Sequence, residues 1–254
     1  MSEEAGDGRA VRFAYNDEII ENKGKGESPA HEESSEGQDP VESATQESGD
    51  GLLGLKVRNF GPLIIAQNYE RMQGTGSAVW QAAEAMLQMM TLPAYQTMLN
   101  DRKVLELGAG TGINSLAAAM SKGHVVATDG DLESLALIEE NVKKNQFQLN
   151  RPVVVRQLVW GDQAQIKAIK QEFGLFDVIL GSDVLFEAIE GHLLVTVYEL
   201  CAMQGVVILT HTPRESAREN SILQSFSRYF NMTQSIVSGT DVVCTFLTRK
   251  ITYY

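Results

Sequence analysis

The stretch KVLELGAGTG, residues 103–112, constrains the fold of this chain more than any other feature. Gly108, Gly110 and Gly112 directly follow a short apolar run, and they permit a tight turn where a ligand can approach the backbone closely. A helical pattern begins at Ile113, so the free N–H groups of that helix face the same space. The stretch therefore predicts a strand, a ligand-binding turn and a helix.

An aspartate at the end of the next strand pattern narrows the kind of ligand. Asp129 lies seventeen residues beyond Gly112, where a carboxylate can accept hydrogen bonds from both hydroxyls of a ribose. The dinucleotide fingerprint G-x-G-x-x-G would require glycine at position 113, which is Ile113 here. Glu106 before the glycines favours a cationic ligand over a pyrophosphate. The pattern predicts a nucleoside-containing ligand, and the alternative is a plain tight turn with a buried, capping Glu106.

Strand and helix patterns alternate over the rest of the chain. Strands are expected at 104–107, 124–128, 153–159, 176–181 and 205–210, and helices at 113–121, 131–146, 163–173 and 187–203. A β-hairpin within 52–68 and a helix within 74–90, capped by Thr75 or Ser77, precede them, and a helix and a hairpin turning at SGTD follow. The alternation predicts an α/β, doubly wound, mostly parallel sheet with a C-terminal antiparallel hairpin. Ligands of such sheets bind beyond the carboxyl ends of the strands.

The first fifty residues differ from the rest in charge. They hold fourteen Asp or Glu and four Lys or Arg, and so carry most of the chain's net charge of −12. A segment this rich in Ser, Gly and Glu buries too little apolar surface to offset chain entropy. We therefore expect a disordered acidic arm over residues 1–50 and one folded domain over residues 51–254.

Charge and composition also exclude several classes of protein. The acidic balance argues against direct binding to nucleic acid or to anionic membranes. No apolar run reaches the roughly 18–20 residues of a membrane span, and the acidic N-terminus is unlike a signal peptide. Cys201 and Cys244 have neither metal-ligand nor disulfide-framework spacing. We expect a monomeric protein of the cytoplasm, or also of the nucleus, without a metal.

Four segments in order resemble a known family. VLELGAGTG followed by VVATDGD is similar to motif I and the second-strand acid of class I S-adenosylmethionine-dependent methyltransferases. GTGSAVWQAA, LVWGD and FDVILGSDVLFE narrow the resemblance to methyltransferase family 16, a seven-strand group with many protein-lysine methyltransferases. The resemblance covers about residues 55–249. It implies a Rossmann-like seven-stranded domain, S-adenosyl-L-methionine as cofactor and a lysine of a protein substrate as acceptor.

The resemblance also implies roles for individual residues. It implies a cofactor site made of Trp80, Glu106, Gly108, Ala109, Gly110, Gly112, Asp129, Trp160, Asp162 and Ser182. In that site the tryptophans would flank the adenine region, Asp129 would bind the ribose and Asp162 would lie near the adenine edge. Asp183 to Phe186 matches the family's D-x-x-Y/F motif, which is associated with the substrate lysine and methyl transfer.

The residues themselves leave alternatives to these roles. Either tryptophan could be core packing, and Asp183 could cap the helix expected from Glu187. Phe186 lacks the hydroxyl of the commoner tyrosine, and Gln81 replaces an acid that often follows the tryptophan. His211, after the fifth strand, could lie on the rim of an acceptor tunnel or be an ordinary loop residue.

Three alternative functions stay open from the sequence. A small amine could replace the protein acceptor, and a non-catalytic interaction protein could retain the fold. A nicotinamide-dependent oxidoreductase is disfavoured by Ile113 and Glu106. The acidic arm favours a basic protein partner, such as a component of the translation machinery or a chaperone.

Overall fold

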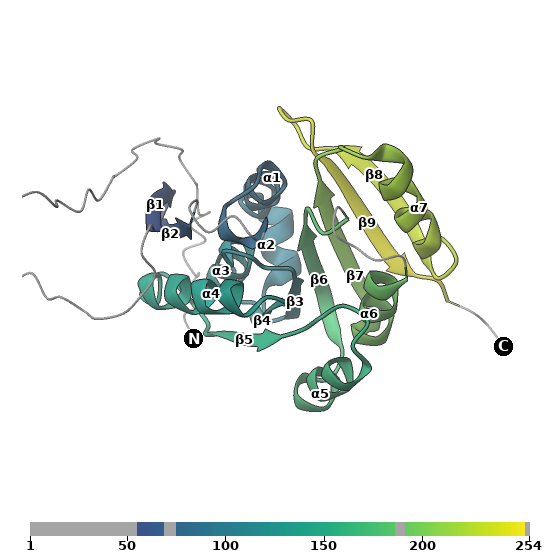
Figure 1. The fold of residues 1–254 in the computed structure, drawn as a ribbon, viewed down its shortest axis with the longest axis horizontal. Coiled ribbons are helices and arrows are strands. Elements are labelled where there is room, and N and C mark those ends of the chain that lie inside the picture. Colours follow the sequence, from purple (N-terminus) through teal and green to yellow (C-terminus); the bar gives the residue numbers. More distant parts are fainter. Residues whose placement is uncertain (1–54, 69–74, 186–190, 252–254) are drawn as a thin grey trace, which may run out of the picture.

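The computed structural model describes residues 55–68, 75–185 and 191–251 (Figure 1). The predicted acidic arm and Phe186 lie outside these residues. The main sheet consists, in spatial order, of β5 (Val153–Gln157), β4 (His124–Asp129), β3 (Lys103–Leu107), β6 (Phe176–Ser182), β7 (Cys201–His211), β9 (Val243–Arg249) and β8 (Phe230–Ile236). Strands β3 to β7 pair in parallel, and β9 pairs antiparallel with β7 and with β8. The expected doubly wound α/β sheet with a terminal hairpin is confirmed.

The strand order reverses between β3 and β6. From β3 the chain proceeds outward through β4 to β5, and it then returns to the other side of β3 to form β6 and β7. The connections on the two sides of this point diverge, which leaves a crevice at the carboxyl ends of the two central strands. The glycine turn after β3 lies at this crevice.

Helices cover both faces of the sheet (Figure 1). One face carries α1 (Gln81–Met90), α2 (Pro93–Leu99), α3 (Ile113–Met120) and α4 (Leu132–Lys144), and the other carries α5 (Gln163–Phe173), α6 (His192–Leu200) and α7 (Ser216–Phe226). Successive residues of β3 serve the two layers, because Val104 packs with the first group and Leu105 and Leu107 pack with the second. Burial on both faces explains why the central strands read as continuous apolar runs.

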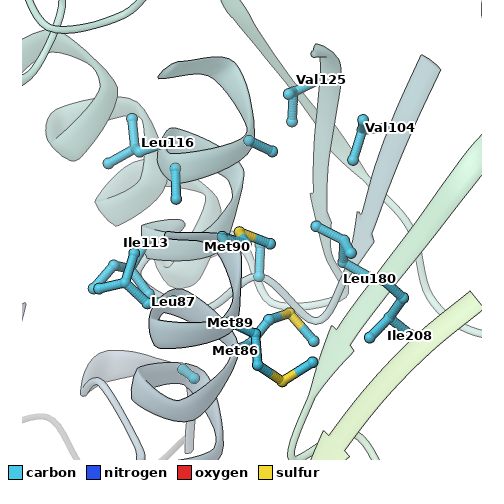
Figure 2. Close-up of a cluster of buried hydrophobic side chains, with 14 of the residues drawn as sticks. Met86, Leu87, Met89, Met90, Val104, Ile113, Leu116, Val125, Leu180 and Ile208 are labelled. Carbon is cyan, nitrogen blue, oxygen red and sulfur yellow. The ribbon is translucent and has the colours of Figure 1, made fainter. Parts of the chain in front are cut away.

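Methionines of α1 fill the core between the first helical layer and the sheet (Figure 2). Met86, Met89 and Met90 are buried and lie toward Leu180 of β6 and Ile208 of β7. Unbranched, flexible side chains suit the irregular space between a helix and a twisted sheet. The interpretation of these methionines as core packing is confirmed.

The predicted N-terminal hairpin is also present. β1 (Leu55–Phe60) pairs antiparallel with β2 (Leu63–Asn68) in a separate two-stranded sheet. The free edge of β2 lies along α4, where Asn141 and Asn145 accept the backbone N–H groups of Ala66 and Ile64. The hairpin is thus fixed to the helix that follows β4.

Several expected boundaries are wrong for identifiable reasons. Thr75–Ser77 forms a separate 3₁₀ turn, and α1 begins only at Gln81, with Trp80 at the N-cap position and no side-chain cap. The helix expected to run to residue 203 ends at Leu200, because pairing with β6 begins at Cys201. The short helix α2, which begins at Pro93, was not predicted.

The described residues contain no helix that is long and apolar enough to cross a membrane. The same part of the chain holds no group of three or more His, Cys, Asp or Glu side chains that could bind a metal ion. Cys201 and Cys244 are both buried free thiols.

Candidate active site

A cleft of about 1370 Å³ opens at the carboxyl ends of β3, β4 and β6. This exceeds the roughly 300–1,000 Å³ of a typical small-molecule pocket. The structure brings together nine of the predicted residues around the cleft: Trp80, Gly108, Ala109, Gly110, Asp129, Trp160, Asp162, Ser182 and Asp183. Two others, Glu106 and Gly112, lie behind its wall. The volume leaves room for a nucleoside cofactor and a side chain of a second substrate.

The glycine turn forms the floor of the cleft. Gly108 and Gly110 have φ values of 63° and 55°, in the left-handed region that favours glycine. A Cβ atom at Gly110 would lie 2.8 Å from the carbonyl oxygen of Gly76, and one at Gly108 would lie 3.1 Å from the ring of Trp160. A side chain at Gly110 would therefore collide with the backbone of Gly76, and one at Gly108 would crowd the ring of Trp160. The turn presents bare backbone to a ligand.

Gly112 serves packing rather than the cleft. It is the N-cap residue of α3 with φ 77°, and a Cβ atom there would lie 3.0 Å from Ile138 of α4. The missing side chain lets α3 and α4 approach each other. Ala109, by contrast, lines the cleft and donates its N–H to the carbonyl of Thr128, which anchors the turn to β4.

Asp129 links the end of β4 to the glycine turn. Its Oδ2 accepts the N–H of Gly110 at 2.9 Å, and its Oδ1 accepts the N–H of Asp131 at 3.0 Å. Burial is the main cause that raises the pKa of this carboxyl, and the backbone hydrogen bonds oppose the shift. Each carboxylate oxygen has a second lone pair. The group can therefore hold the turn and accept ligand hydroxyls together.

Glu106 lies under the turn and is completely buried. Its Oε2 accepts the hydroxyl of Ser115 at 2.5 Å, and the backbone of Ser115 also bonds to this carboxyl. Burial raises the pKa of Glu106 to about 7. Glu106 is therefore buried and capping, as in the alternative that the sequence left open. Its bonds to Ser115 fix the start of α3.

The two tryptophans form opposite parts of the wall. Trp160 lies against Gly108, and Trp80 lies where α1 begins. Asp162 lines the cleft beside Trp160 while its Oδ1 caps α5 by accepting the N–H groups of residues 164 and 165. Ser182, at the end of β6, accepts a hydrogen bond of 3.3 Å from the amide of Asn114.

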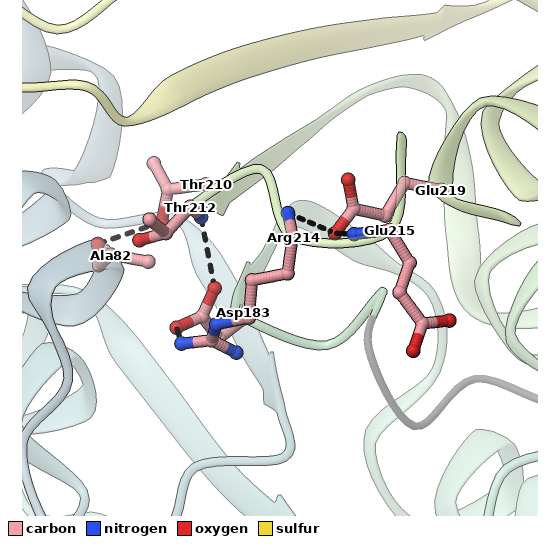
Figure 3. A network of polar contacts seen from close by, with 7 residues as sticks. All are labelled: Ala82, Asp183, Thr210, Thr212, Arg214, Glu215 and Glu219. Carbon is pink, nitrogen blue, oxygen red and sulfur yellow. Dashed lines mark hydrogen bonds and ion pairs between the residues drawn. The ribbon is translucent and has the colours of Figure 1, made fainter. Parts of the chain in front are cut away.

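Asp183 lines the cleft directly after β6, and Figure 3 shows its contacts with the connection that follows β7. It has φ 54°, and its N–H donates to the carbonyl of Thr210 at 2.8 Å. Its Oδ1 accepts the N–H of Thr212 at 3.0 Å, and its Oδ2 contacts the guanidinium of Arg214 at 3.1 Å. These bonds run to the connection between β7 and α7, and α6 begins only at His192. Among the described residues, Asp183 caps no helix.

Neither expectation for His211 is met. It is the last residue of β7, only 5% exposed, and lies outside the cleft lining. Burial lowers the pKa of its imidazole. Gln81 is exposed at the start of α1 and does not line the cleft either.

Sequence reasoning missed Arg214, Gly76 and His192, all of which line the cleft. Arg214 could have been suspected, because it is a basic residue directly after the fifth strand, at the ligand-binding end of the sheet. Gly76 lies in the 3₁₀ turn before α1 and His192 is the first residue of α6, and no periodic signal in the sequence shows that these positions reach the cleft.

Comparisons with known proteins agree with this geometry. A family model described as lysine methyltransferase matches residues 58–232. The chain is 32% identical over 171 residues to the protein N-lysine methyltransferase METTL21A of Xenopus tropicalis. The matched region covers 66% of this chain and 74% of the relative. It is also 30% identical over 172 residues to EEF1A lysine methyltransferase 3 of Mus musculus. That matched region covers 67% of this chain and 70% of the relative.

Solved structures share the fold. A putative SAM-dependent methyltransferase from Streptococcus mutans matches with a TM-score of 0.55 and 16% identity, over 79% of this chain and 57% of that chain. The glycopeptide N-methyltransferase MtfA matches with a TM-score of 0.51 and 13% identity, over 65% of this chain and 90% of that chain. Both likenesses concern the architecture. Since the family model spans most of the folded domain, this chain belongs to methyltransferase family 16, the lysine methyltransferases.

Proposed function

We propose that this protein transfers a methyl group from S-adenosylmethionine to the side-chain amine of a lysine in a protein substrate. The observation that carries the proposal is the lining of the cleft, which combines a bare glycine turn, Asp129 and the fixed carboxylate of Asp183. The names of the similar proteins, which are lysine methyltransferases, support the same acceptor.

The residues present fit the cofactor. Gly108 and Gly110 line the cleft with backbone alone, which suits the close approach of the amino acid part. Asp129 has lone pairs left for the ribose hydroxyls. Trp160 offers a broad apolar surface and Asp162 a polar edge for adenine. When bound, S-adenosylmethionine supplies a sulfonium methyl carbon that accepts the lone pair of the acceptor nitrogen while the carbon–sulfur electron pair returns to sulfur.

The acceptor end must position an uncharged amine. A free lysine has a pKa of about 10.4, so its ammonium must lose a proton to solvent before the nitrogen has a lone pair to donate. Asp183 lines the cleft, and its Oδ2 can accept a hydrogen bond from the amine beside the contact with Arg214, while the N–H of Thr212 holds Oδ1 in place. Phe186 would add an apolar wall, as the family motif implies. Positioning and desolvation are then the main contributions of the protein.

The substrate is proposed to be a basic protein, such as a component of the translation machinery or a chaperone. Acidic side chains, Asp131, Glu133 and Asp162, line the cleft. The acidic residues of segment 1–50 would add a longer-range attraction to such a partner. Attraction of this kind acts mainly on the rate of encounter.

Two measurements test the proposed function. Calorimetry with S-adenosylhomocysteine should give saturable binding, and no heat at millimolar concentrations would refute the cofactor assignment. Incubation of the full chain with methyl-labelled cofactor and a cell lysate should label a protein band whose hydrolysate contains methyl-lysine. Label confined to small metabolites would assign a small amine as the acceptor, and bound cofactor with no labelled product would indicate a non-catalytic protein.

A further inference from the structure

Arg214 occupies a defined place in the cleft that the proposed function does not yet use (Figure 3). Its guanidinium contacts Asp183 Oδ2 at 3.1 Å and lies 5.4 Å from the ring centre of Trp80. The three residues come from separate parts of the chain: the start of α1, the end of β6 and the connection between β7 and α7. The cation therefore bridges an aromatic face and the carboxylate expected to meet the acceptor.

The backbone around Arg214 is held in place by hydrogen bonds to a buried glutamate. Glu219 of α7 is only 4% exposed, and its Oε1 accepts the N–H of Arg214 at 3.0 Å and that of Glu215 at 3.3 Å. Thr210, whose carbonyl accepts the N–H of Asp183, also donates its hydroxyl to Ala82 of α1 at 2.9 Å. Helix α1, the end of β6 and the Arg214 segment are thus joined in one hydrogen-bonded network.

The charges around Asp183 explain why this contact matters. The described titratable groups near it are Arg214, His211 and Glu219, with Glu215 farther along the same connection toward Arg218. Burial lowers the pKa of His211, so the imidazole is neutral near pH 7. Glu219 adds a negative charge. The positive charge that offsets the Asp183 carboxylate in this group is therefore that of Arg214.

An uncompensated carboxylate would work against methyl transfer. An opposite charge within about 4–6 Å stabilises a charged group by roughly one to three pKa units. A bare Asp183 would therefore hold the incoming lysine as an ammonium ion, which has no lone pair. The full charge of the ammonium gains more from the carboxylate than the partial charge on nitrogen in the transition state, so the barrier rises.

We infer that Arg214 is a positioning residue that acts through Asp183: it neutralises the acceptor end of the cleft, so that the substrate lysine binds as a free amine. This inference rests on the proposed function. With Arg214 in place, Asp183 Oδ2 still has a lone pair for the amine, and the guanidinium stays on the face of Trp80.

The experiment compares pH profiles of methyl transfer to the acceptor protein isolated from the labelled lysate. Single-turnover rates and acceptor KM are measured from about pH 6.5 to 10 for the wild type, Arg214→Gln and Arg214→Lys. Arg218→Gln is the matched control, because Arg218 lies four residues away, contacts Glu215 and lies outside the cleft lining. Melting temperatures and S-adenosylhomocysteine affinities confirm that each variant is folded and binds cofactor.

For Arg214→Gln we expect the rate to fall about tenfold or more at pH 7.5 and to recover toward pH 10, an upward shift of the profile by about one unit or more. KM should stay equal or fall, because the ammonium form binds well. Arg214→Lys should restore most of the wild-type profile, and Arg218→Gln should keep it unchanged. In an Asp183→Asn background neither charge is left after Arg214→Gln, so the profile of the double variant should return to the pH range of the wild type.

If Arg214 had only a structural role, Arg214→Gln would lower the melting temperature and leave the pH profile unchanged. This result would overturn the inference. A higher kcat/KM at neutral pH would also overturn it, since Arg214 would then obstruct the acceptor. A shift that persists in the Asp183→Asn background would show that Arg214 does not act through Asp183. Failure of the wild type to label any lysine would instead refute the proposed function, and the inference with it.

Discussion

The side-chain amide of Asn141 hydrogen-bonds both backbone groups of Ala66 and also reaches the glycine turn. Its Oδ1 accepts the N–H of Ala66 at 2.7 Å, and its Nδ2 donates to the carbonyls of Ala66 at 3.0 Å and Thr111 at 2.9 Å. Asn145, one turn later, pairs with Ile64 in the same way and has no described bond to the turn. A single buried amide thus joins the N-terminal hairpin to the candidate cofactor site.

This relationship predicts different outcomes for two matched substitutions. Asn141→Asp keeps the shape but replaces the donor with an acceptor, so the carbonyls of Ala66 and Thr111 lose their partner at a cost of about 1–3 kcal/mol each. Asn145→Asp removes the donor to the carbonyls of Ile64 and Asn141, and neither of these bonds involves the glycine turn. Both variants should melt at lower temperature, and only Asn141→Asp should also weaken S-adenosylhomocysteine binding, by several-fold in calorimetry. Equal affinities in the two variants would disprove the coupling.

The sequence predicted the parts of the molecule that periodicity and turn chemistry determine. The strand–turn–helix around Gly108 and the helix expected from residue 131 both follow from local patterns, and in the structure Asp131 is the N-cap of α4 and accepts the N–H of Ser134. The alternation of strands and helices specified the sheet, and the glycine spacing specified where a ligand approaches it.

The remainder depends on contacts between distant residues. Asn141 meets β2 across 75 positions, and Arg214 meets Asp183 across 31. No periodic pattern encodes such pairs, because each side chain is selected by a neighbour that only the assembled fold supplies. The expectations for His211 were wrong for the same reason, since β7 continues through this residue, which pairs with Val243 of β9 and has a buried side chain.

Gly110→Ala tests the bare backbone of the turn. Gly110 and Gly239 both have positive φ, but a Cβ atom at Gly239 meets nothing within 4 Å, whereas one at Gly110 lies 2.8 Å from Gly76. Both alanine variants should lose about 1–2 kcal/mol of stability from left-handed strain. Only Gly110→Ala should also weaken S-adenosylhomocysteine binding, by about tenfold or more, because the displaced turn no longer positions the ligand. Comparable losses at both positions would contradict a close-approach role.

Glu106 should make stability depend on pH. Burial raises its pKa in the folded protein to about 7, from 4.5 for an unperturbed glutamate. The folded protein therefore binds more protons than the unfolded chain between these values, and the free energy of unfolding falls as pH rises through this window, by an amount on the order of 3 kcal/mol. Glu106→Gln cannot titrate, so its stability relative to the wild type should increase from pH 4.5 to pH 7.5.

Denaturant unfolding of both proteins at several pH values isolates this contribution, since the other carboxyls are common to the two. Stability curves that stay parallel across the window would show that Glu106 has no raised pKa in the folded protein.

The acidic arm should act through long-range attraction. Removing residues 1–50 eliminates a segment with fourteen acidic and four basic side chains. We expect kcat/KM for a basic acceptor protein to fall at about 10 mM salt and to change little at about 0.5 M, where charges are screened within a few ångströms. An arm of equal length with Gln and Asn at the acidic positions is the control, and it should behave like the deletion. If that neutral arm retains the full activity at low salt, charge is not the cause.

Asp183 provides the sharpest test of the catalytic assignment. Its φ of 54° is a conformation that asparagine tolerates well, and an asparagine oxygen can still accept the N–H of Thr212. Asp183→Asn therefore removes the charge and the acceptor atom next to Arg214 while keeping the local backbone. S-adenosylhomocysteine affinity should stay within a few-fold, because the glycine turn and Asp129 are the residues expected to hold the cofactor.

The single-turnover rate of methyl transfer by Asp183→Asn should fall roughly 10²-fold, the scale expected when a reacting group is no longer aimed. Asp183→Ala should show a similar rate loss and a lower melting temperature, because alanine also abandons the Thr212 hydrogen bond and is strained at positive φ. The comparison separates orientation of the acceptor from support of the fold. An Asp183→Asn protein with the wild-type transfer rate would limit Asp183 to the structural role of holding the connection between β7 and α7.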